Sequence, residues 1–187
     1  MIRVWRLTKR RTAGFDGEGS RRYGGRWNHP GAPAVYTAAH LSLAVLEVLV
    51  HVTAVADLPA DLVAIPADLP DDLLIENARI EDLPRDWRRI PAPAALADRG
   101  TAWLTAARTA VLAVPSAVVP PETVYILNPA HPDFRRIIVG RAEPFGLDAR
   151  LGHGRGASSP AVSSGRQPRR AGSAPWRRPG STGRSWS

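Results

Sequence analysis

The sequence contains no cysteine, a single lysine and no long apolar run. The absence of cysteine excludes disulfides, thiolate metal sites and a catalytic thiol. The one lysine, Lys9, is not part of a GK[ST] phosphate-binding loop, and no GxSxG nucleophile elbow is present. There is no run of about eighteen apolar residues and no apolar signal segment, so we expect a cytoplasmic protein that does not contact the membrane.

Metal and dinucleotide motifs are also weak or missing. The five histidines form no HxH or HxxxH pair, so no metal site is expected. The stretch GFDGEG at residues 14–19 is glycine-rich, but it lacks the preceding strand and following helix of a dinucleotide-binding fold. Any nucleotide must therefore be bound in another way.

The positive charge is concentrated at one end of the chain. Residues 152–187 hold seven arginines and no acid, and removing these seven charges from the total of +8 leaves +1 for residues 1–151. This end segment is rich in Gly, Ser, Pro and Arg and has no Leu, Ile, Phe or Tyr, a composition typical of disorder. We predict a domain over residues 1–151 and a disordered tail over residues 152–187. The tail is either an electrostatic arm for nucleic acid or, the favoured alternative, an extension without function, such as a GC-rich gene read out of frame.

The order of the expected elements favours an α+β fold. Strands outnumber helices and do not alternate with them, which predicts small mixed or antiparallel sheets with a few helices. The periodicity predicts strands at 2–7, 33–38, 61–69, 112–119, 123–128 and 134–140, helices at 40–52 and 99–112, and loops at 8–32 and 70–97.

Glu47 is the first candidate for chemistry. It lies in the apolar helix segment LSLAVLEVLVHV, where His51 is its only polar neighbour at helical spacing. An apolar helix of this kind is expected to be buried on more than one face, where an unpaired carboxylate costs several kcal/mol. Glu47 therefore needs a cation or a chemical role. The alternatives are a surface carboxylate leaning toward His51 and an ion pair that only stabilises the fold.

Arg26 is the expected cation. It lies in RRYGGRWN, where Gly24 and Gly25 let a ligand approach the backbone and Trp27 is predicted to form one wall of a pocket. An arginine in such a loop suits the oxygens of a phosphate or a carboxylate. For Arg21 and Arg22, an ordinary solvated turn is the favoured interpretation.

Three further residues have two interpretations each. Tyr36 lies on a strand that leads directly into the helix of Glu47, so it either shares a cleft with Glu47 or belongs to the core. Ser116 follows a proline at the end of an apolar run and either forms a turn or faces the same cleft. Asn128 either caps the turn before Pro129 or contacts the substrate.

Taken together, the ordered motifs resemble one family. The succession WRL, FDGEGSRRYGGRWN, VYTA, LAVLEVLVH, GTAWL, VPSAVVP, ILNPAHPDF and PFGLDARL resembles the RES-domain proteins, named for an arginine, a glutamate and a serine. Arg26, Glu47 and Ser116 match the name-giving residues, Tyr36 matches the active-site tyrosine, and Arg6 matches an arginine of the first strand. The resemblance covers residues 1–151.

The resemblance implies a fold similar to ADP-ribosyltransferases and a toxin of a type II toxin–antitoxin pair. Its partner would be an Xre-like helix-turn-helix antitoxin, and homo-oligomers within that complex are compatible with it. Members consume NAD⁺ as phosphorylases or glycohydrolases, so NAD⁺ is a substrate, inorganic phosphate is a possible co-substrate, and no resident cofactor is expected.

The resemblance also assigns roles to residues. Glu47 would stabilise the cationic sugar, Arg26 and Arg6 would hold the diphosphate, and Tyr36 would position the ribose. Ser116 would bind the ribose or Glu47, and the further substrate contacts would be Gly25, Trp27 and Asn128. Two other functions remain open: ADP-ribosylation of a protein, and a nucleic-acid-binding module that uses the basic tail.

Overall fold

The computed structural model of the protein describes residues 1–52, 58–148 and 151. In this part of the chain, eight strands form one sheet in the order β4-β5-β6-β2-β1-β3-β7, and β8 also pairs with β3. The β4–β5 pair is parallel, and the other described pairs are antiparallel. The strands are β1 (Ile2–Lys9), β2 (Val35–Ala38), β3 (Leu62–Leu69), β4 (Ile75–Asn77), β5 (Val111–Pro115), β6 (Thr123–Leu127), β7 (Ile138–Val139) and β8 (Glu143–Pro144).

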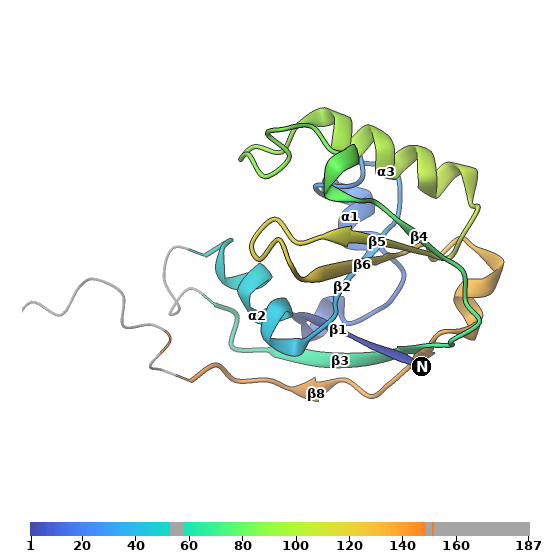
Figure 1. Ribbon diagram of the computed structural model, residues 1–187. Helices are drawn as coiled ribbons and strands as arrows, with labels where there is room; N and C mark the ends of the chain where they lie inside the picture. The colour runs from blue at the N-terminus through green and yellow to red at the C-terminus, as the bar shows by residue number, and fades with distance from the viewer. Residues whose placement is uncertain (53–57, 149–150, 152–187) are drawn as a thin grey trace, which may run out of the picture. The chain divides into compact units, whose positions relative to one another are not determined.

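The helices of the described residues are fewer than the strands and do not alternate regularly with them, as predicted for an α+β fold. They are α1 (Glu18–Tyr23), α2 (Leu41–Leu49) and α3 (Ala94–Ala106), with short 3-10 segments η1 (Arg10–Thr12), η3 (Ile80–Asp82) and η4 (Pro132–Arg136). None of the helices in the described residues is long and apolar enough to cross a membrane. The predicted fold class is confirmed, with one curled sheet in place of several small ones (Figure 1).

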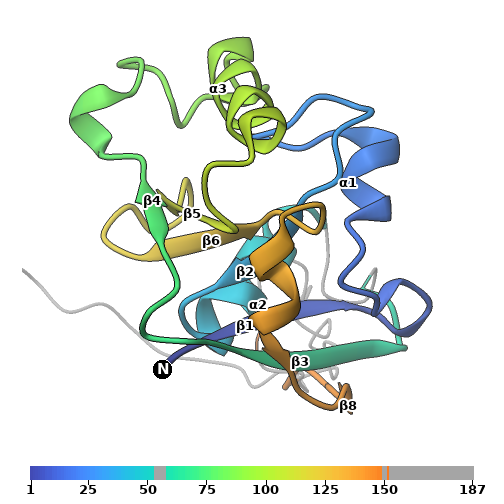
Figure 2. The ribbon, with the colours of Figure 1, turned by 90° about the vertical axis from the view of Figure 1, so that its right-hand side faces the viewer.

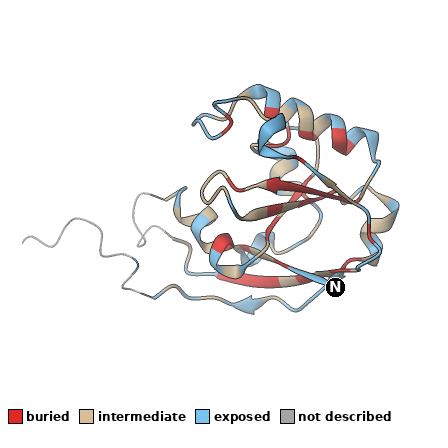
Figure 3. Cartoon of the chain, in the orientation of Figure 1, coloured by how far each residue is buried: buried red, intermediate tan, exposed pale blue. Residues whose placement is uncertain are grey.

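Both faces of the sheet are covered. On one face, Leu43 of α2 and Trp103 of α3 pack with strand residues such as Leu112 and Ile126. On the other face, Val4 and Val35 belong to a second cluster against which Phe134 of η4 packs. Figures 1 and 2 show α2 and η4 on opposite sides of the sheet. Figure 3 shows the buried positions gathered along the strands and on the inner side of α3.

Local chemistry explains where the helices differ from expectation. The polar helix α1 lies within the predicted loop 8–32, because Glu18 binds both Arg21 and Arg22 at helical spacing and Gly24, at φ 72°, ends the helix. Helix α3 begins at residue 94 instead of 99, because Pro93 precedes its first turn and disrupts no helical hydrogen bond. It ends at residue 106, where Ala107 adopts a left-handed conformation.

Helix α2 is less buried than its apolar sequence predicts. Leu43 and Ala44 are buried, but Leu46 is 39% exposed and Val50 is 52% exposed. The expected burial on more than one face is therefore wrong: the helix packs on the sheet by one side. The prediction of a disordered tail over residues 152–187 lies outside the described residues.

Candidate functional site

The RRYGGRWN segment divides into a helix end and a tight turn. Arg21 and Arg22 end α1, where both pair with Glu18; they lie in a helix and not in the expected turn, but their side chains are exposed to solvent as predicted. The following residues fold back, because the Gly25 N–H donates to the Asn28 carbonyl at 2.9 Å. Trp27 is 2% exposed and belongs to the core cluster, so the structure places its ring inside the fold and not as the wall of a pocket.

Asn28 organises this turn, and sequence reasoning missed it. Its side chain is 1% exposed, and its Nδ2 donates to the Ser20 carbonyl at 3.0 Å and to the Ala32 carbonyl at 2.9 Å. Its Oδ1 accepts a hydrogen bond from the Tyr36 hydroxyl at 2.7 Å. The residue type alone gives no signal for this role, because it depends on where the loop carbonyls converge.

Tyr36 connects the turn to the sheet. Its hydroxyl donates to Asn28 and accepts from the Trp27 N–H at 3.1 Å. Gly25 is required beside it, because a Cβ at that position would lie 2.6 Å from the Tyr36 hydroxyl oxygen. Burial raises the pKa of Tyr36 above its ordinary value, against the opposing effects of the Trp27 N–H and the Arg26 charge. The phenol is therefore neutral at physiological pH.

Glu47 and Ser116 are in direct contact. The Ser116 hydroxyl donates to Glu47 Oε1 at 2.6 Å, although the two residues lie on α2 and just after β5. Ser116 is completely buried, and its oxygen accepts from the N–H groups of Val118 and Val119 at 3.1 and 2.9 Å. Three hydrogen bonds thus fix the hydroxyl, which in turn holds the carboxylate. Of the two predicted alternatives for Ser116, the structure shows the turn, and the buried hydroxyl also contacts the carboxylate of Glu47.

Arg26 lies near the same carboxylate. Its Nη1 donates to the Trp87 carbonyl at 2.6 Å. Burial lowers the pKa of Arg26, and the nearby charge of Glu47 opposes that shift. Arg26, Tyr36, Glu47 and Ser116 therefore form one cluster linked by hydrogen bonds and electrostatics, built from the turn, β2, α2 and the end of β5, although Arg26 forms no ion pair with any described residue. A fixed carboxylate beside a guanidinium can stabilise a developing cation while an anionic group is held nearby.

Arg6 lies on the other face of the sheet. It alternates along β1 with Trp5 and Leu7, which pack in the cluster that includes Tyr36, whereas Arg6 shares the side of Val4. Its guanidinium lies 5.9 Å from the Phe15 ring centre, and its buried Nε has no hydrogen-bond partner among the described residues. This position does not support the expected shared role with Arg26 in diphosphate binding.

Asn128 has a structural position. It follows β6 at the end that pairs with the start of β5, whereas Ser116 follows the opposite end of β5. Its Nδ2 donates to the Leu104 carbonyl at 3.0 Å and its Oδ1 accepts from the Ala130 N–H at 3.1 Å. The geometry favours the turn-capping interpretation over a substrate contact.

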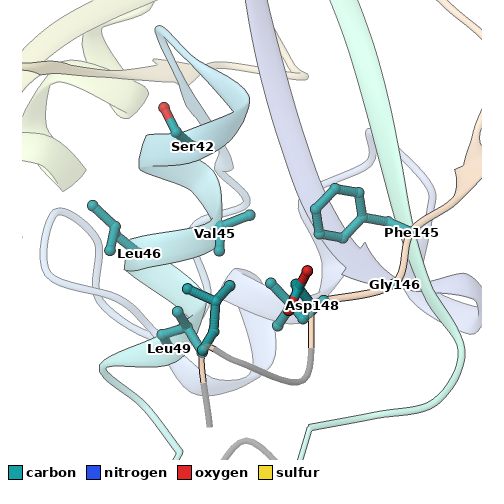
Figure 4. Close-up of a pocket in the computed structure, with 9 residues that line it drawn as sticks. Ser42, Val45, Leu46, Leu49, Phe145, Gly146 and Asp148 are labelled. Carbon is teal, nitrogen blue, oxygen red and sulfur yellow. The ribbon is translucent and has the colours of Figure 1, made fainter. Parts of the chain in front are cut away.

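A separate apolar hollow lies along α2. Its volume is about 370 Å³, and Figure 4 shows side chains of α2 facing those of the segment after β8 across it. Glu47 is not among its lining residues, and no basic side chain lines it, so it offers nothing to bind phosphate. The lining residues are Ser42, Val45, Leu46, Leu49, Phe145, Gly146, Leu147, Asp148 and Leu151.

Comparisons with known proteins identify the fold and the family of this chain. The fold is similar to that in the crystal structure of the M. tuberculosis MbcT-MbcA toxin-antitoxin complex, with a TM-score of 0.61, 19% identity, and coverage of 76% of this chain and 83% of the other. The RES domain model matches residues 3–148. The chain therefore belongs to the RES-domain family.

Curated relatives carry the name of a toxin. "Toxin Res" of Photorhabdus laumondii subsp. laumondii is 40% identical over 79% of this chain and 96% of its own length. "Toxin Res" of Yersinia enterocolitica is 38% identical over 79% and 98%. "Prs ADP-ribosylating toxin" of Sphingobium sp. is 37% identical over 79% and 94%. The family and the toxin class predicted from the motifs are confirmed.

Proposed function

We propose that this protein is a toxin that cleaves NAD⁺ at the bond between nicotinamide and ribose. The observation that carries the proposal is the 2.6 Å hydrogen bond from Ser116 to Glu47, which fixes a carboxylate close to the Arg26 guanidinium. Membership of the RES family and the ADP-ribosylating relative support it, because cleavage of that bond is the first step of any ADP-ribosyl transfer.

The chemistry of this bond suits a fixed carboxylate. When C1′ of the ribose separates from the pyridinium nitrogen, the bonding electron pair goes to the nitrogen and nicotinamide leaves as a neutral molecule. The sugar then resembles an oxocarbenium cation, which the Glu47 carboxylate stabilises electrostatically. The leaving group needs no proton, so the cluster requires no general acid.

Arg26 and Tyr36 would bind two different parts of the substrate, the diphosphate and the ribose. Arg26 donates to Trp87 through Nη1 and retains Nη2 and Nε for diphosphate oxygens. The single proton of the Tyr36 hydroxyl is donated to Asn28, so this oxygen has only a lone pair to offer to a ribose hydroxyl. Tyr36 is thus a hydrogen-bond acceptor for substrate.

The group that attacks C1′ distinguishes the possible activities. Attack by inorganic phosphate gives ADP-ribose 1″-phosphate, and attack by water gives ADP-ribose and releases one proton. Attack by a protein side chain gives an ADP-ribosylated protein. The name of the Sphingobium relative favours the third activity as the second candidate.

Product analysis separates these activities. Purified protein is incubated with NAD⁺ in buffers with and without phosphate, with and without bacterial lysate proteins, and products are identified by mass spectrometry. We expect loss of NAD⁺ with release of nicotinamide from the wild-type protein and a rate lower by about 100-fold or more from Glu47→Gln. Intact NAD⁺ under every condition would refute the proposal.

The partner would be an antitoxin, as in the complex to which the fold is similar. We propose an Xre-like helix-turn-helix protein that covers the Arg26–Glu47 cluster. Co-expression of such a protein from the neighbouring gene should restore growth to cells that express this chain and should prevent NAD⁺ loss in the purified complex. Unchanged NAD⁺ loss in a stable complex would contradict the proposed position of the antitoxin.

A further inference from the structure

The segment of residues 84–91, here called the 84–91 strap, connects the two loops that carry the site. Its Trp87 is 6% exposed and packs in the core, while the Trp87 carbonyl accepts the hydrogen bond from Arg26. The next residue, Arg88, donates from Nε to the Ala117 carbonyl at 2.9 Å, directly after Ser116 in the chain. The strap is therefore tied to the Arg26 turn on one side and to the Ser116 loop on the other.

Arg88 has donors that the fold does not use. Its Nε is occupied by Ala117, but its two terminal nitrogens have no hydrogen bond or ion pair to any described residue. The neighbouring Arg89 differs, because its Nη1 lies 3.7 Å from Asp86 Oδ2. The Nε bond orients the planar guanidinium, so the two free nitrogens form a fork held close to Ser116.

The charge of the site indicates what this fork can bind. Arg26 carries one positive charge, which the nearby Glu47 carboxylate offsets. The diphosphate of NAD⁺ carries two negative charges, so Arg26 alone cannot balance it. Arg6, the other arginine expected to help, lies on the opposite face of the sheet. Arg88 is a further cation on the Ser116 side, because its hydrogen bond to the Ala117 carbonyl holds it next to Ser116 in the chain.

We propose that Arg88 is a second phosphate-binding residue, which grips the diphosphate of the substrate together with Arg26 from the opposite loop. The proposal rests on the function proposed above. Arg88 acts in substrate affinity and not in cleavage, because Glu47, which Ser116 holds in place, is the group that stabilises the reacting sugar. The strap thus adds specificity for a dinucleotide over a nucleoside that lacks phosphate.

Three variants of Arg88 separate its charge from its structural bond. Arg88→Ala removes both, Arg88→Gln keeps an N–H that can donate to the Ala117 carbonyl but removes the charge, and Arg88→Lys keeps the charge. Arg85→Ala is the matched control, because Arg85 is an exposed arginine of the same strap without a hydrogen bond to either loop. Thermal unfolding shows whether each variant is folded.

The measurements are kcat and KM for NAD⁺ and the dissociation constant for ADP-ribose by calorimetry. For Arg88→Ala and Arg88→Gln we expect KM and the dissociation constant to rise about tenfold or more, with kcat nearly unchanged. Arg88→Lys should recover part of the affinity, and Arg85→Ala should match the wild type. A merely structural Arg88 would leave the affinity of Arg88→Gln intact.

The outcomes distinguish this inference from the proposed function. If wild-type protein consumes NAD⁺ while Arg88→Gln keeps the wild-type KM and ADP-ribose affinity, the role of Arg88 is refuted and the function stands. If wild-type protein binds ADP-ribose through Arg88 but never consumes NAD⁺, the binding role stands and the function is refuted. Absence of both turnover and binding in the wild type refutes both.

Discussion

The charge of Glu47 can be tested separately from its hydrogen bond to Ser116, because a glutamine at this position removes the charge and can keep the hydrogen bond. In Glu47→Gln the side-chain carbonyl can still accept from Ser116, so the packing of α2 against the Ser116 loop is preserved. The electrostatic stabilisation of a cationic sugar is lost, and we expect kcat for NAD⁺ cleavage to fall about 100-fold or more. Initial rates test this, and an unchanged thermal midpoint confirms that the fold is intact. A fully active Glu47→Gln would contradict the mechanism.

Tyr36 should make the stability of the fold sensitive to alkaline pH. Burial raises its pKa in the folded protein above the value of about 10 in the unfolded chain. Below that pH both states keep the proton, and the stability is fully present. As the pH rises above about 10, the unfolded state loses its proton first, and the free energy of unfolding falls.

Denaturant unfolding between about pH 9 and 11 measures how steeply the free energy of unfolding falls with rising pH. Tyr36→Phe should be less stable at neutral pH, because it leaves Asn28 Oδ1 and the Trp27 N–H without their partner. It should also lose less stability than the wild type as the pH rises. Tyr23→Phe is the control, since Tyr23 is 83% exposed. Equal slopes for wild type and Tyr36→Phe would refute the argument.

Residue chemistry predicted part of this site and missed the rest. A carboxylate in an apolar helix and an arginine in a glycine-rich turn are anomalies that a sequence displays, so Glu47 and Arg26 could be found. The contacts of Asn28 and Arg88 depend on carbonyl groups brought together by the folded loops, and no pattern encodes them. Trp27 was misjudged because a tryptophan suits a pocket wall and a core equally well.

At the scale of elements, α3 packs unusually close to the RRYGGRWN turn. A Cβ at Gly100 would lie 1.8 Å from the Trp27 carbonyl oxygen, a distance that no repacking of side chains can relieve. Gly100→Ala must therefore push α3 away from the turn, and we expect a loss of about 1–3 kcal/mol in the free energy of unfolding. Arg26 lies in the same turn, directly before Trp27, so KM for NAD⁺ should rise as well.

Gly19→Ala is the matched control for this prediction. Gly19 also lies in a helix, but a Cβ there would meet no heavy atom within 4 Å. Alanine favours helix by up to about 1 kcal/mol over glycine, so this variant should be unchanged or slightly more stable. Denaturant unfolding of both variants decides the question. Equal stabilities would show that the contact between α3 and the turn is dispensable.

Periodicity predicted the long elements and failed for the short ones. Strands β1, β3 and β6 and the body of α2 follow apolar runs of their own, and the structure confirms them. Helix α1 depends on ion pairs, and the three-residue strand β4 depends on its parallel partner β5, so neither has an apolar period. The predicted strand at 134–140 is reduced to β7, because η4 occupies its first residues.

For the molecule as a whole, the proposed site and the positive charge occupy different parts of the chain. Every residue of the proposed site lies between residues 26 and 117, and the family match ends at residue 148. Residues 152–187 hold seven arginines, so their deletion leaves a chain with a net charge of only +1. A nucleic-acid function and an NAD⁺-cleaving function therefore make opposite predictions for a protein that ends at residue 151.

We expect the shortened protein to cleave NAD⁺ at the wild-type rate and to arrest growth as the full chain does. Any affinity of the full chain for DNA should fall in the shortened protein, with a shallower dependence on salt, since each lost phosphate contact reduces the slope by about 0.9. Full-length Glu47→Gln keeps the basic residues and should not arrest growth. The opposite result would be that the shortened protein no longer arrests growth while full-length Glu47→Gln still does. The toxin would then act through nucleic acid, and the Arg26–Glu47 cluster would not be its active site.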